Sequence, residues 1–491
     1  MLQILTKGQS FVDEMGRERI FNGLNMVFKG KVVEGSKELS YIPDWGEDHF
    51  RWLKDNGFNM IRLGIVWDAI EHEMGHYDEA YLDWVGRMLD LCAKYDVYAF
   101  LDMHQDLYGR PLGGGAPSWA FLADTQDHAE GALWSDAYII SEAINTAYRK
   151  FWENAKAKDG VGLQDHYANM WAHIAKRYHG HEALVGYDVL NEPFAGENSQ
   201  LIFGTLLGAY AQVTGQPMTP EELMMAFGDV DRKHALLKKI DDVTLYTAMT
   251  EPAFPYIESF DLKDLAPFYN RMTTAIRQVV PDGIMMMEHS YFSNMGIPCS
   301  LPPITVDGER EPLQAYSPHA YDLVVDTPRV VDATNNRLTA ILSRLKAMQD
   351  RLSIPVLMGE WGAHDRYAEG LSHIAYILGY FDRHKWSHTY WCYFDGMEQA
   401  RVMGVLRRPY PQAVNGVIEA YHNDQNSDTF TLSWTEADAS DLPTVVYLPH
   451  SPKAVHVDGT YRVEQLTDAS DACLLMIEPE SKGHRELTVQ L

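Results

Sequence analysis

Short apolar runs alternate with amphipathic stretches from residue 20 to about residue 415. Segments such as 79–95, 169–180, 336–352 and 371–384 repeat apolar residues near the helical period, whereas the apolar runs are short enough for strands. The eight predicted strands are 20–26, 59–64, 97–103, 184–191, 283–288, 313–319, 354–360 and 387–393. Eight strand–helix units predict an α/β fold, a (β/α)8 TIM barrel. An open doubly wound sheet is the alternative, but its GxGxxG fingerprint is missing after the first strand.

The pattern changes after Asn423, where short period-two runs such as TFTLSW and TVVYLP are separated by turn residues. This spacing is typical of an antiparallel β-sandwich, so we expect a barrel domain over 1–423 and a sandwich over 424–491. Two insertions, at about 108–160 and 195–260, follow the third and fourth barrel strands. Both leave the carboxyl end of a strand, where barrel active sites lie.

The second insertion carries the apolar segments LIFGTLLGAY at 201–210 and LMMAF at 223–227. Two interpretations are open. The segments form a cap over an apolar groove, for which flexible methionine is well suited. Alternatively, they are the core-facing stripes of a helical subdomain, which is the commoner role of such patterns.

Composition narrows the classes of partner. The 491 residues carry a formal net charge of −28, which argues against nucleic-acid binding and against electrostatic docking on anionic lipid. No apolar run approaches the 18 residues of a membrane span, which leaves room only for transient contact with lipid. Without a recognisable signal peptide the chain as written is expected to be cytoplasmic, or secreted if a leader has been removed. The four cysteines form no CxxC pair and are expected to be buried thiols.

Polar clusters end three of the predicted strands. DMHQD (102–106) ends the third, Asn191-Glu192-Pro193 the fourth, and GEWG (359–362) the seventh. Glutamates at such strand ends can approach to about 5 Å, the separation that a retaining glycosidase needs. Glu192 would be the acid/base, with a raised pKa, and Glu360 the nucleophile, which must stay ionised.

Neighbouring side chains suit the same chemistry. Asn191 would donate to the sugar 2-hydroxyl, and Tyr321 would orient Glu360. Arg62 would hold the negative charge of Glu360 and lower its pKa. Trp391 offers a flat apolar face for a sugar ring.

Together these motifs resemble the clan A, family 5 retaining glycoside hydrolases. The resemblance is carried by Asn191-Glu192-Pro193, Glu360, Arg62, His104, His319, Tyr321 and Trp391. The chain is most similar to the endoglycoceramidases of that family, through stretches such as GLNMVFKGK, FLDMHQDLYG, GYDVLNEPF, YSPHAY, LMGEWG and RRPYPQAVNG.

This resemblance implies cofactor-free, retaining hydrolysis of the β-glycosidic bond between a glycan and ceramide. It also implies that Lys31, His104, Asp106 and His319 bind the substrate. The second insertion is longer than in comparable members. An exo-acting β-glucosidase or β-galactosidase, on a glycosylceramide or another glycoside with an apolar aglycone, is therefore the alternative.

Two other functional classes are compatible with single features of the sequence. HEMGH, from His72 to His76, matches the HExxH motif of zinc peptidases, which needs both histidines on one helix. Gly75 and a predicted helix start at residue 79 indicate a loop instead, so no metal site is expected. A carbohydrate-binding module with a decayed site is the non-enzymatic hypothesis, and the intact pair Glu192 and Glu360 argues against it.

Four further residues have both a structural and a functional interpretation. Trp119 and Trp134 in the first insertion either stack on sugars or pack internally. Asp102 is expected to be structural and to turn away from the barrel mouth, because side chains alternate along a strand. His289 is expected to be a satisfied core or surface histidine, with support of the site as the alternative.

Overall fold

The computed structural model describes residues 1–33, 39–110, 112–325, 327–364, 370–424, 427–436, 441–467, 470–480 and 483–491. Eight parallel strands form one sheet in the order β13-β10-β9-β8-β7-β4-β17-β15. Their bounds are β4 (Asn22–Met26), β7 (Met60–Ile65), β8 (Tyr98–Met103), β9 (Leu184–Asp188), β10 (Ile284–Met287), β13 (Gln314–Tyr316), β15 (Leu357–Met358) and β17 (Ser387–Tyr390). A parallel bridge between Tyr316 and Val356 joins the two ends of this sheet. The predicted (β/α)8 barrel is confirmed.

Near the mouth, the sixth and seventh barrel strands continue as a second parallel pair. β14 (His319–Ala320) pairs with β16 (Glu360–Trp361), and His319 lies directly opposite Glu360. Every residue of β4, β7, β8 and β10 is buried. Parallel barrel strands have one face on the helices and one on the barrel interior, which explains why residues on both faces of these strands are buried.

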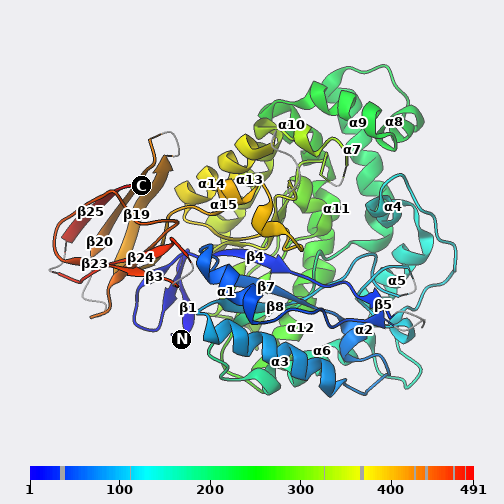
Figure 1. Ribbon diagram of the computed structural model, residues 1–491. Helices are drawn as coiled ribbons and strands as arrows, with labels where there is room; N and C mark the ends of the chain where they lie inside the picture. The colour runs from blue at the N-terminus through cyan, green and yellow to red at the C-terminus, as the bar shows by residue number, and fades with distance from the viewer. Residues whose placement is uncertain are drawn as a thin grey trace.

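Six helices surround the barrel (Figure 1). They are α1 (Glu47–Asp55), α3 (Glu79–Lys94), α6 (Leu163–Tyr178), α12 (Ala266–Arg277), α13 (Asn335–Leu352) and α14 (Leu371–His384). The start of α3 shows why the sequence begins a helix there, since the Asp78 side chain accepts a hydrogen bond from the backbone N–H of Tyr81. Two short helices, α2 (Trp67–Ile70) and α15 (Met403–Leu406), follow β7 and β17.

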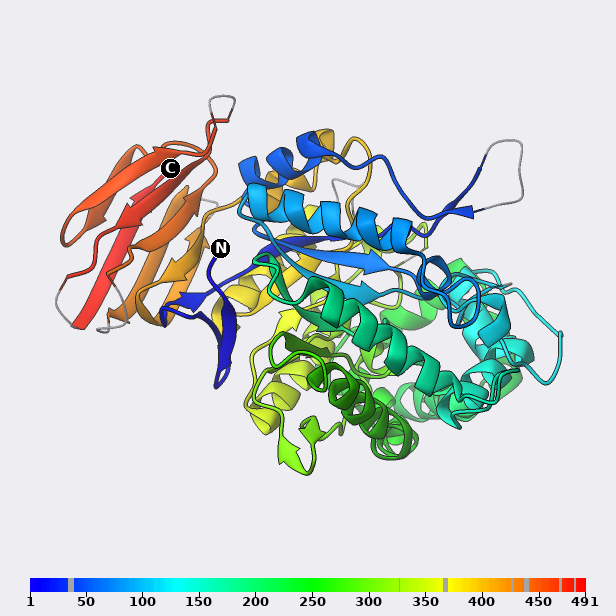
Figure 2. The ribbon, with the colours of Figure 1, turned by 90° about the horizontal axis from the view of Figure 1, so that it is seen from below.

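The two insertions are helical and lie at the carboxyl ends of the strands. The first contains α4 (Ala137–Ile140) and α5 (Glu142–Trp152). The second contains α7 (Ser199–Thr214), α8 (Pro220–Phe227), α9 (Val230–Leu237), α10 (Val243–Thr250) and α11 (Phe254–Phe260). The hairpin of β5 (Lys31–Val32) and β6 (Leu39–Ser40) extends on the same side of the molecule (Figure 2). A second hairpin joins β11 (Thr305–Val306) to β12 (Glu309–Arg310).

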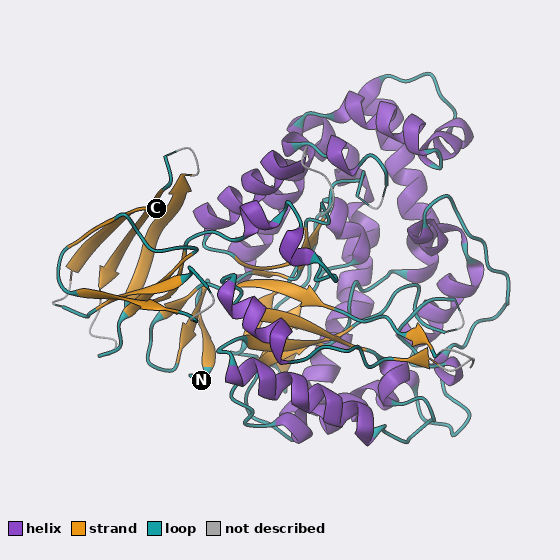
Figure 3. Cartoon of the chain, in the orientation of Figure 1, coloured by secondary structure: helices purple, strands orange, loops and turns teal. Residues whose placement is uncertain are grey.

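The C-terminal region forms antiparallel sheets (Figure 3), as predicted. One sheet contains β1 (Ile4–Lys7), β2 (Ser10–Asp13), β3 (Glu18–Arg19), β18 (Tyr410–Val414), β21 (Thr444–Leu448), β24 (Cys473–Ile477) and β23 (Tyr461–Gln465). The other contains β19 (Gly416–Asp424), β20 (Thr429–Glu436), β25 (Gly483–Gln490) and β22 (Ala454–Val457). Strands that precede residue 424 share these sheets with strands that follow it. A domain boundary at residue 424 therefore stays a prediction.

The sandwich lies at the end of the barrel remote from the insertions (Figures 1 and 2). The Tyr410 hydroxyl donates to the carbonyl oxygen of Gly57 at 2.6 Å, and Arg408 forms two hydrogen bonds of 2.5 and 2.6 Å with buried Asp382. Gly57 precedes β7, so the sandwich packs on the amino ends of the barrel strands, and the mouth at their carboxyl ends faces away from it. Among the described residues, no helix has both the length and the apolarity that a membrane crossing requires.

Candidate active site

A cavity of about 410 Å³ opens at the carboxyl ends of the barrel strands. Its two ends differ in chemistry. The polar end is lined by Lys29, His104, Asp106, Asn191, Glu192, Tyr321, Glu360 and Trp391. The apolar end is lined mainly by insertion residues, among them Phe203, Leu206, Leu207, Met224, Phe227 and Met249.

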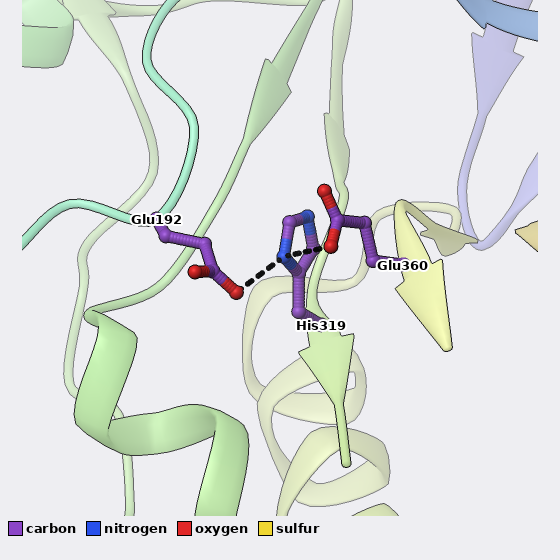
Figure 4. A group of neighbouring side chains, drawn as sticks. All are labelled: Glu192, His319 and Glu360. Carbon is purple, nitrogen blue, oxygen red and sulfur yellow. Dashed lines mark hydrogen bonds and ion pairs between the residues drawn. The ribbon is translucent and has the colours of Figure 1, made fainter. Parts of the chain in front are cut away.

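Glu192 and Glu360 face each other across His319 at the polar end (Figure 4). His319 Nδ1 lies 3.0 Å from Glu192 Oε1 and 3.5 Å from Glu360 Oε2. An oxygen of each carboxylate and an imidazole nitrogen all lie within 4.8 Å of one another. Retaining glycosidases hold their carboxyl groups about 5–5.5 Å apart, whereas inverting enzymes leave roughly 6.5–9.5 Å for a water molecule. The geometry matches the retaining class.

Glu360 is buried among donors. Arg62 Nη1 donates to its Oε1 at 2.7 Å, and the Tyr321 hydroxyl donates to its Oε2 at 3.0 Å. Burial nevertheless raises the pKa of Glu360, and His319 and Arg62 offset this only in part. The expectation that Arg62 lowers the pKa of Glu360 therefore describes one contribution and not the net shift.

Arg62 lowers the pKa of Glu360 only in part because its guanidinium pairs with several carboxylates at once. Besides Glu360, its guanidinium forms ion pairs at 2.7 to 2.9 Å with Asp102, Asp188 and Glu288. Arg62, Asp102 and Asp188 are fully buried, so one positive charge is divided over four carboxylates. Burial and the neighbouring Glu288 raise the pKa of Asp188 well above its usual range.

His319 supplies the second positive charge of this cluster. Burial alone would lower its pKa, but Glu288 and Glu360 raise it well above the ordinary value. The contact between His319 and Glu288 also changes the pKa of Glu288. Burial would raise the pKa of Glu288, yet His319 Nε2, 3.3 Å from the carboxylate, lowers it to about 2. The positively charged form of His319 is thus favoured between the two catalytic candidates.

The backbone of Glu192 adopts a left-handed conformation, with φ of 46°. Such a conformation is uncommon for a residue other than glycine and must be held by its surroundings. Glu288 Oε2 accepts the backbone N–H of Glu192 at 2.8 Å, and Asn294 Nδ2 donates to Glu192 Oε1 at 2.7 Å. His289 is buried and hydrogen-bonds Asn294 Oδ1 at 2.8 Å, so it supports Glu192 through Asn294.

Glu288 and Asn294 were not selected from the sequence as site residues. Glu288 follows β10 directly, just as Glu192 and Glu360 lie at the ends of the fourth and seventh predicted strands. The same signal could therefore have found it. Asn294 lies in a short 3₁₀ helix, Tyr291–Met295, and no sequence signal pointed to it.

The remaining polar residues surround the space beside Trp391. His104 stacks on Trp391 with ring centroids 5.4 Å apart, and its Nδ1 is 2.9 Å from Asp102 Oδ2. Asp106 forms an ion pair of 2.6 Å with Lys29. Asn191 is held by Arg62 Nη2, which donates to its Oδ1 at 2.9 Å.

Two residues lie elsewhere than expected. Lys31 is exposed on β5 and does not line the cavity, whereas Lys29 takes that place because the chain leaves the mouth before the hairpin begins. Asp102 turns into the barrel and contacts Arg62 and His104. The two-residue period of a strand places Asp102 on the same face as His104, so the expectation that it turns away was wrong.

The two tryptophans of the first insertion have different roles. Trp119 packs against Trp67, its indole N–H donates to the carbonyl oxygen of Glu71, and it is not among the residues that line the cavity. Trp134 lines the cavity, and its ring centroid lies 5.7 Å from Lys29 Nζ.

The HEMGH segment forms a turn and not a helix. Glu73 and His76 are bridged as antiparallel neighbours, and His72 Nδ1 lies 2.9 Å from Asp68. Within the described ranges, two groups are close enough to hold a metal ion, namely Glu192/His319/Glu360 and Asp102/Asp188/Glu288. Neither group contains His72 or His76, and Arg62 already forms ion pairs with carboxylates of both. The geometry does not support a zinc peptidase.

Comparisons with known proteins agree with this geometry. A family model described as cellulase (glycosyl hydrolase family 5) matches residues 28–396, and a glycoside hydrolase family 5 C-terminal domain matches residues 408–490. The chain belongs to glycosyl hydrolase family 5. The predicted family resemblance is confirmed.

Several proteins are similar to this family 5 member. Endoglycoceramidase I from Rhodococcus hoagii is 24% identical over 97% of this chain and 86% of that protein. The structure of endo-glycoceramidase II from Rhodococcus sp. superposes with a TM-score of 0.75 at 25% identity, covering 99% of both chains. A glucosylceramidase from Aspergillus fumigatus is 29% identical over 46% of this chain. Three curated relatives, the Aspergillus protein among them, are matched over only 39% to 46% of their own length.

Proposed function

We propose that this family 5 member hydrolyses β-linked glycolipids with retention of configuration, cleaving the bond between the sugar and an apolar aglycone such as ceramide. One observation carries the proposal. A single cavity joins a pair of carboxylates at retaining separation to an apolar channel. The relatives named endoglycoceramidase and glucosylceramidase support the same substrate class.

The proposed reaction has two steps. Glu360 attacks the anomeric carbon while Glu192 gives its proton to the leaving oxygen, so the aglycone departs as an alcohol and a glycosyl-enzyme ester forms. Glu192, now a carboxylate, then takes a proton from water, and the resulting hydroxide displaces Glu360. His319, between the two carboxylates, donates to each as its charge grows, and Tyr321 holds Glu360 in line.

The apolar channel begins beside the proposed acid/base. Asn294, which hydrogen-bonds Glu192, lines the cavity together with Phe292 and Met295, and Leu206 and Phe203 continue the lining. A leaving group protonated by Glu192 would enter this channel. Burying an alkyl chain there stabilises the complex by roughly 25 cal/mol per Å² of apolar surface removed from water, before ordering costs.

A second candidate is an exo-acting glycosidase that accepts one sugar only. Lys29 favours it, because its Nζ lies 2.6 Å from Asp106 and 5.2 and 5.7 Å from the rings of Trp391 and Trp134. These contacts join the sugar platform to the first insertion. They narrow the space beyond the first sugar ring, where a longer glycan would have to extend.

Product analysis separates the two candidates. The protein is incubated with lactosylceramide, glucosylceramide and galactosylceramide, and the released species are identified by mass spectrometry. Free lactose with ceramide supports endo cleavage. Release of monosaccharide from the monoglycosyl lipids, with lactosylceramide intact, supports exo cleavage, and Trp134→Ala should then admit lactosylceramide. Hydrolysis of aryl β-glycosides without any release from the lipids would reject the glycolipid part of the proposal.

A further inference from the structure

The exposed face of α7 carries no charge. The helix sequence from Ser199 to Thr214 contains no Asp, Glu, Lys, Arg or His, although these side chains are frequent elsewhere on this acidic chain. Its exposed positions are Gln200, Leu201, Gly204, Gly208 and Gln212. Leu201 is 55% exposed, and no atom lies within 4 Å of a Cβ built at Gly204 or Gly208. A surface helix with an uncharged outer face is unusual for a protein facing only water.

Exposed apolar side chains continue from α7 onto neighbouring elements. Helix α7 contacts both α4 and α8. We define the apolar rim as the five exposed side chains of this region, Trp134, Ile140, Leu201, Met224 and Met225. Figures 1 and 2 place α4, α7 and α8 on the side of the molecule remote from the sandwich. The apolar rim is thus an outward-facing border of the insertions.

The apolar rim is continuous with the cavity. Trp134, Ile140 and Met224 line the cavity and are also more than 40% exposed. An alkyl chain could pass from an external apolar phase, over these side chains, to Phe203 and Leu206, which line the same cavity. Tryptophan and leucine are also side chains that interfacial helices insert among lipids.

The charge of the molecule selects the kind of lipid surface. The net charge is −28, and the helix next to α7 in sequence, α8, begins with exposed Glu221 and Glu222. An anionic leaflet would repel this face. We propose that the apolar rim docks on a neutral or zwitterionic lipid surface and there draws a glycolipid into the cavity. This inference rests on the proposed function, because it describes how the same cavity is supplied with substrate.

The test measures binding separately from hydrolysis. The full chain is floated in a density gradient with vesicles of phosphatidylcholine, or of phosphatidylcholine containing phosphatidylserine. The test variant is Leu201→Ser/Met225→Ser, at positions 55% and 64% exposed that do not line the cavity. The matched control is Val417→Ser/Val463→Ser, two exposed apolar residues on strands β19 and β23 of the sandwich.

The wild-type protein should float with phosphatidylcholine alone, and added salt should not release it, because apolar contacts are not screened. The partition coefficient of the test variant onto the vesicles should be lower by about tenfold or more, since each substitution removes apolar surface that the lipid would bury. The control should change less than twofold. Both variants should hydrolyse a soluble aryl β-glycoside at the wild-type rate.

Four results would overturn the inference. They are no flotation of the wild type, flotation only with phosphatidylserine, equal loss in the test and control variants, or a dimer that the test variant dissociates. None of them bears on the hydrolysis of soluble glycosides. Absence of that hydrolysis would instead reject the proposed function, whatever the vesicles show.

Discussion

The two ends of the cavity are built on opposite principles. At the polar end, Arg62 and His319 are fully buried and each contacts several carboxylates, so every charge has a fixed partner. At the apolar end, Phe203 and Met224 come from insertion helices, and Phe203 packs edge-to-face against Phe227. In the proposed reaction, residues at the ends of the barrel strands supply the reacting groups, while the insertions shape what is bound beside them. Changes at the polar end should affect every substrate, and changes at the apolar end only those with an apolar aglycone.

The largest effect is expected for Glu360→Gln. An amide cannot form the glycosyl ester, so turnover of every substrate should fall on the order of 10⁴-fold or more, as when other enzymes lose their nucleophile. Steady-state kinetics with an aryl β-glycoside measure this. Glu309→Gln, an exposed site on the β11–β12 hairpin, is the control. Near wild-type turnover of Glu360→Gln would exclude Glu360 as the nucleophile.

Glu192→Gln should show the next largest loss, and the loss should depend on the leaving group. General acid catalysis contributes about 10²–10⁴-fold, so hydrolysis of an alkyl glycoside should fall by that factor. The first step with a good aryl leaving group needs no proton and should fall much less. Pre-steady-state release of the aryl alcohol measures it, and equal losses for both leaving groups would contradict the acid role.

Phe203→Ala tests the apolar end alone. It shortens the apolar lining, so kcat/KM for a ceramide glycoside should fall roughly 5- to 100-fold, the range expected for losing one large apolar contact. Hydrolysis of a small aryl glycoside should stay within about threefold. His104→Ala, at the polar end, should lower both. If Phe203→Ala lowered both substrates equally, the two ends would not be separable.

A smaller effect is expected from the buried charge cluster, on how the free energy of unfolding changes with pH. The pKa of Glu288 is about 2 in the folded protein and roughly 4.3 in an unfolded chain, so the folded state binds fewer protons in between. Glu288 therefore stabilises the fold above about pH 4.3, and this contribution is lost as the pH falls toward 2. Glu288→Gln should flatten the fall in the free energy of unfolding over this range, measured with urea. Glu309→Gln should leave the slope unchanged, and the same slope in both variants would refute the pairing with His319.

No effect is expected from the HEMGH segment. His72→Ala/His76→Ala, and treatment with a chelator, should leave turnover unchanged, because the segment is a turn outside the cavity. A loss of activity that added zinc restores would show that a metal supports catalysis.

Much of the polar end could be predicted from the sequence. The barrel follows from the alternation of apolar runs with helices, and Glu192 and Glu360 follow from their positions at strand ends. Site residues at strand ends can be predicted because a parallel barrel brings the carboxyl ends of all its strands to one end of the barrel. The direction of Asp102 was predicted wrongly, since it lies on the same face as His104 and contacts both His104 and Arg62.

Other features depend on contacts that no local pattern contains. Lys29 replaced the predicted Lys31 because the path of the chain between β4 and β5 decides which lysine reaches Asp106. The role of Asn294 and the entry of Trp134 into the cavity depend on how two short 3₁₀ helices, Tyr291–Met295 and Trp134–Asp136, are placed at the mouth. Leu206 of the second insertion is buried in the core and also lines the cavity, so the two interpretations of this insertion do not exclude each other.

The most direct test of the account is to trap the proposed intermediate. The protein is treated with a 2-fluoro-substituted aryl β-glycoside, in which the fluorine slows release of the sugar, and its intact and peptide masses are measured. We predict one fluorosugar per chain, attached to the peptide containing Glu360 and missing from Glu360→Gln. A sugar attached to another residue, or aryl alcohol released with inverted sugar and no adduct, would contradict the central claim.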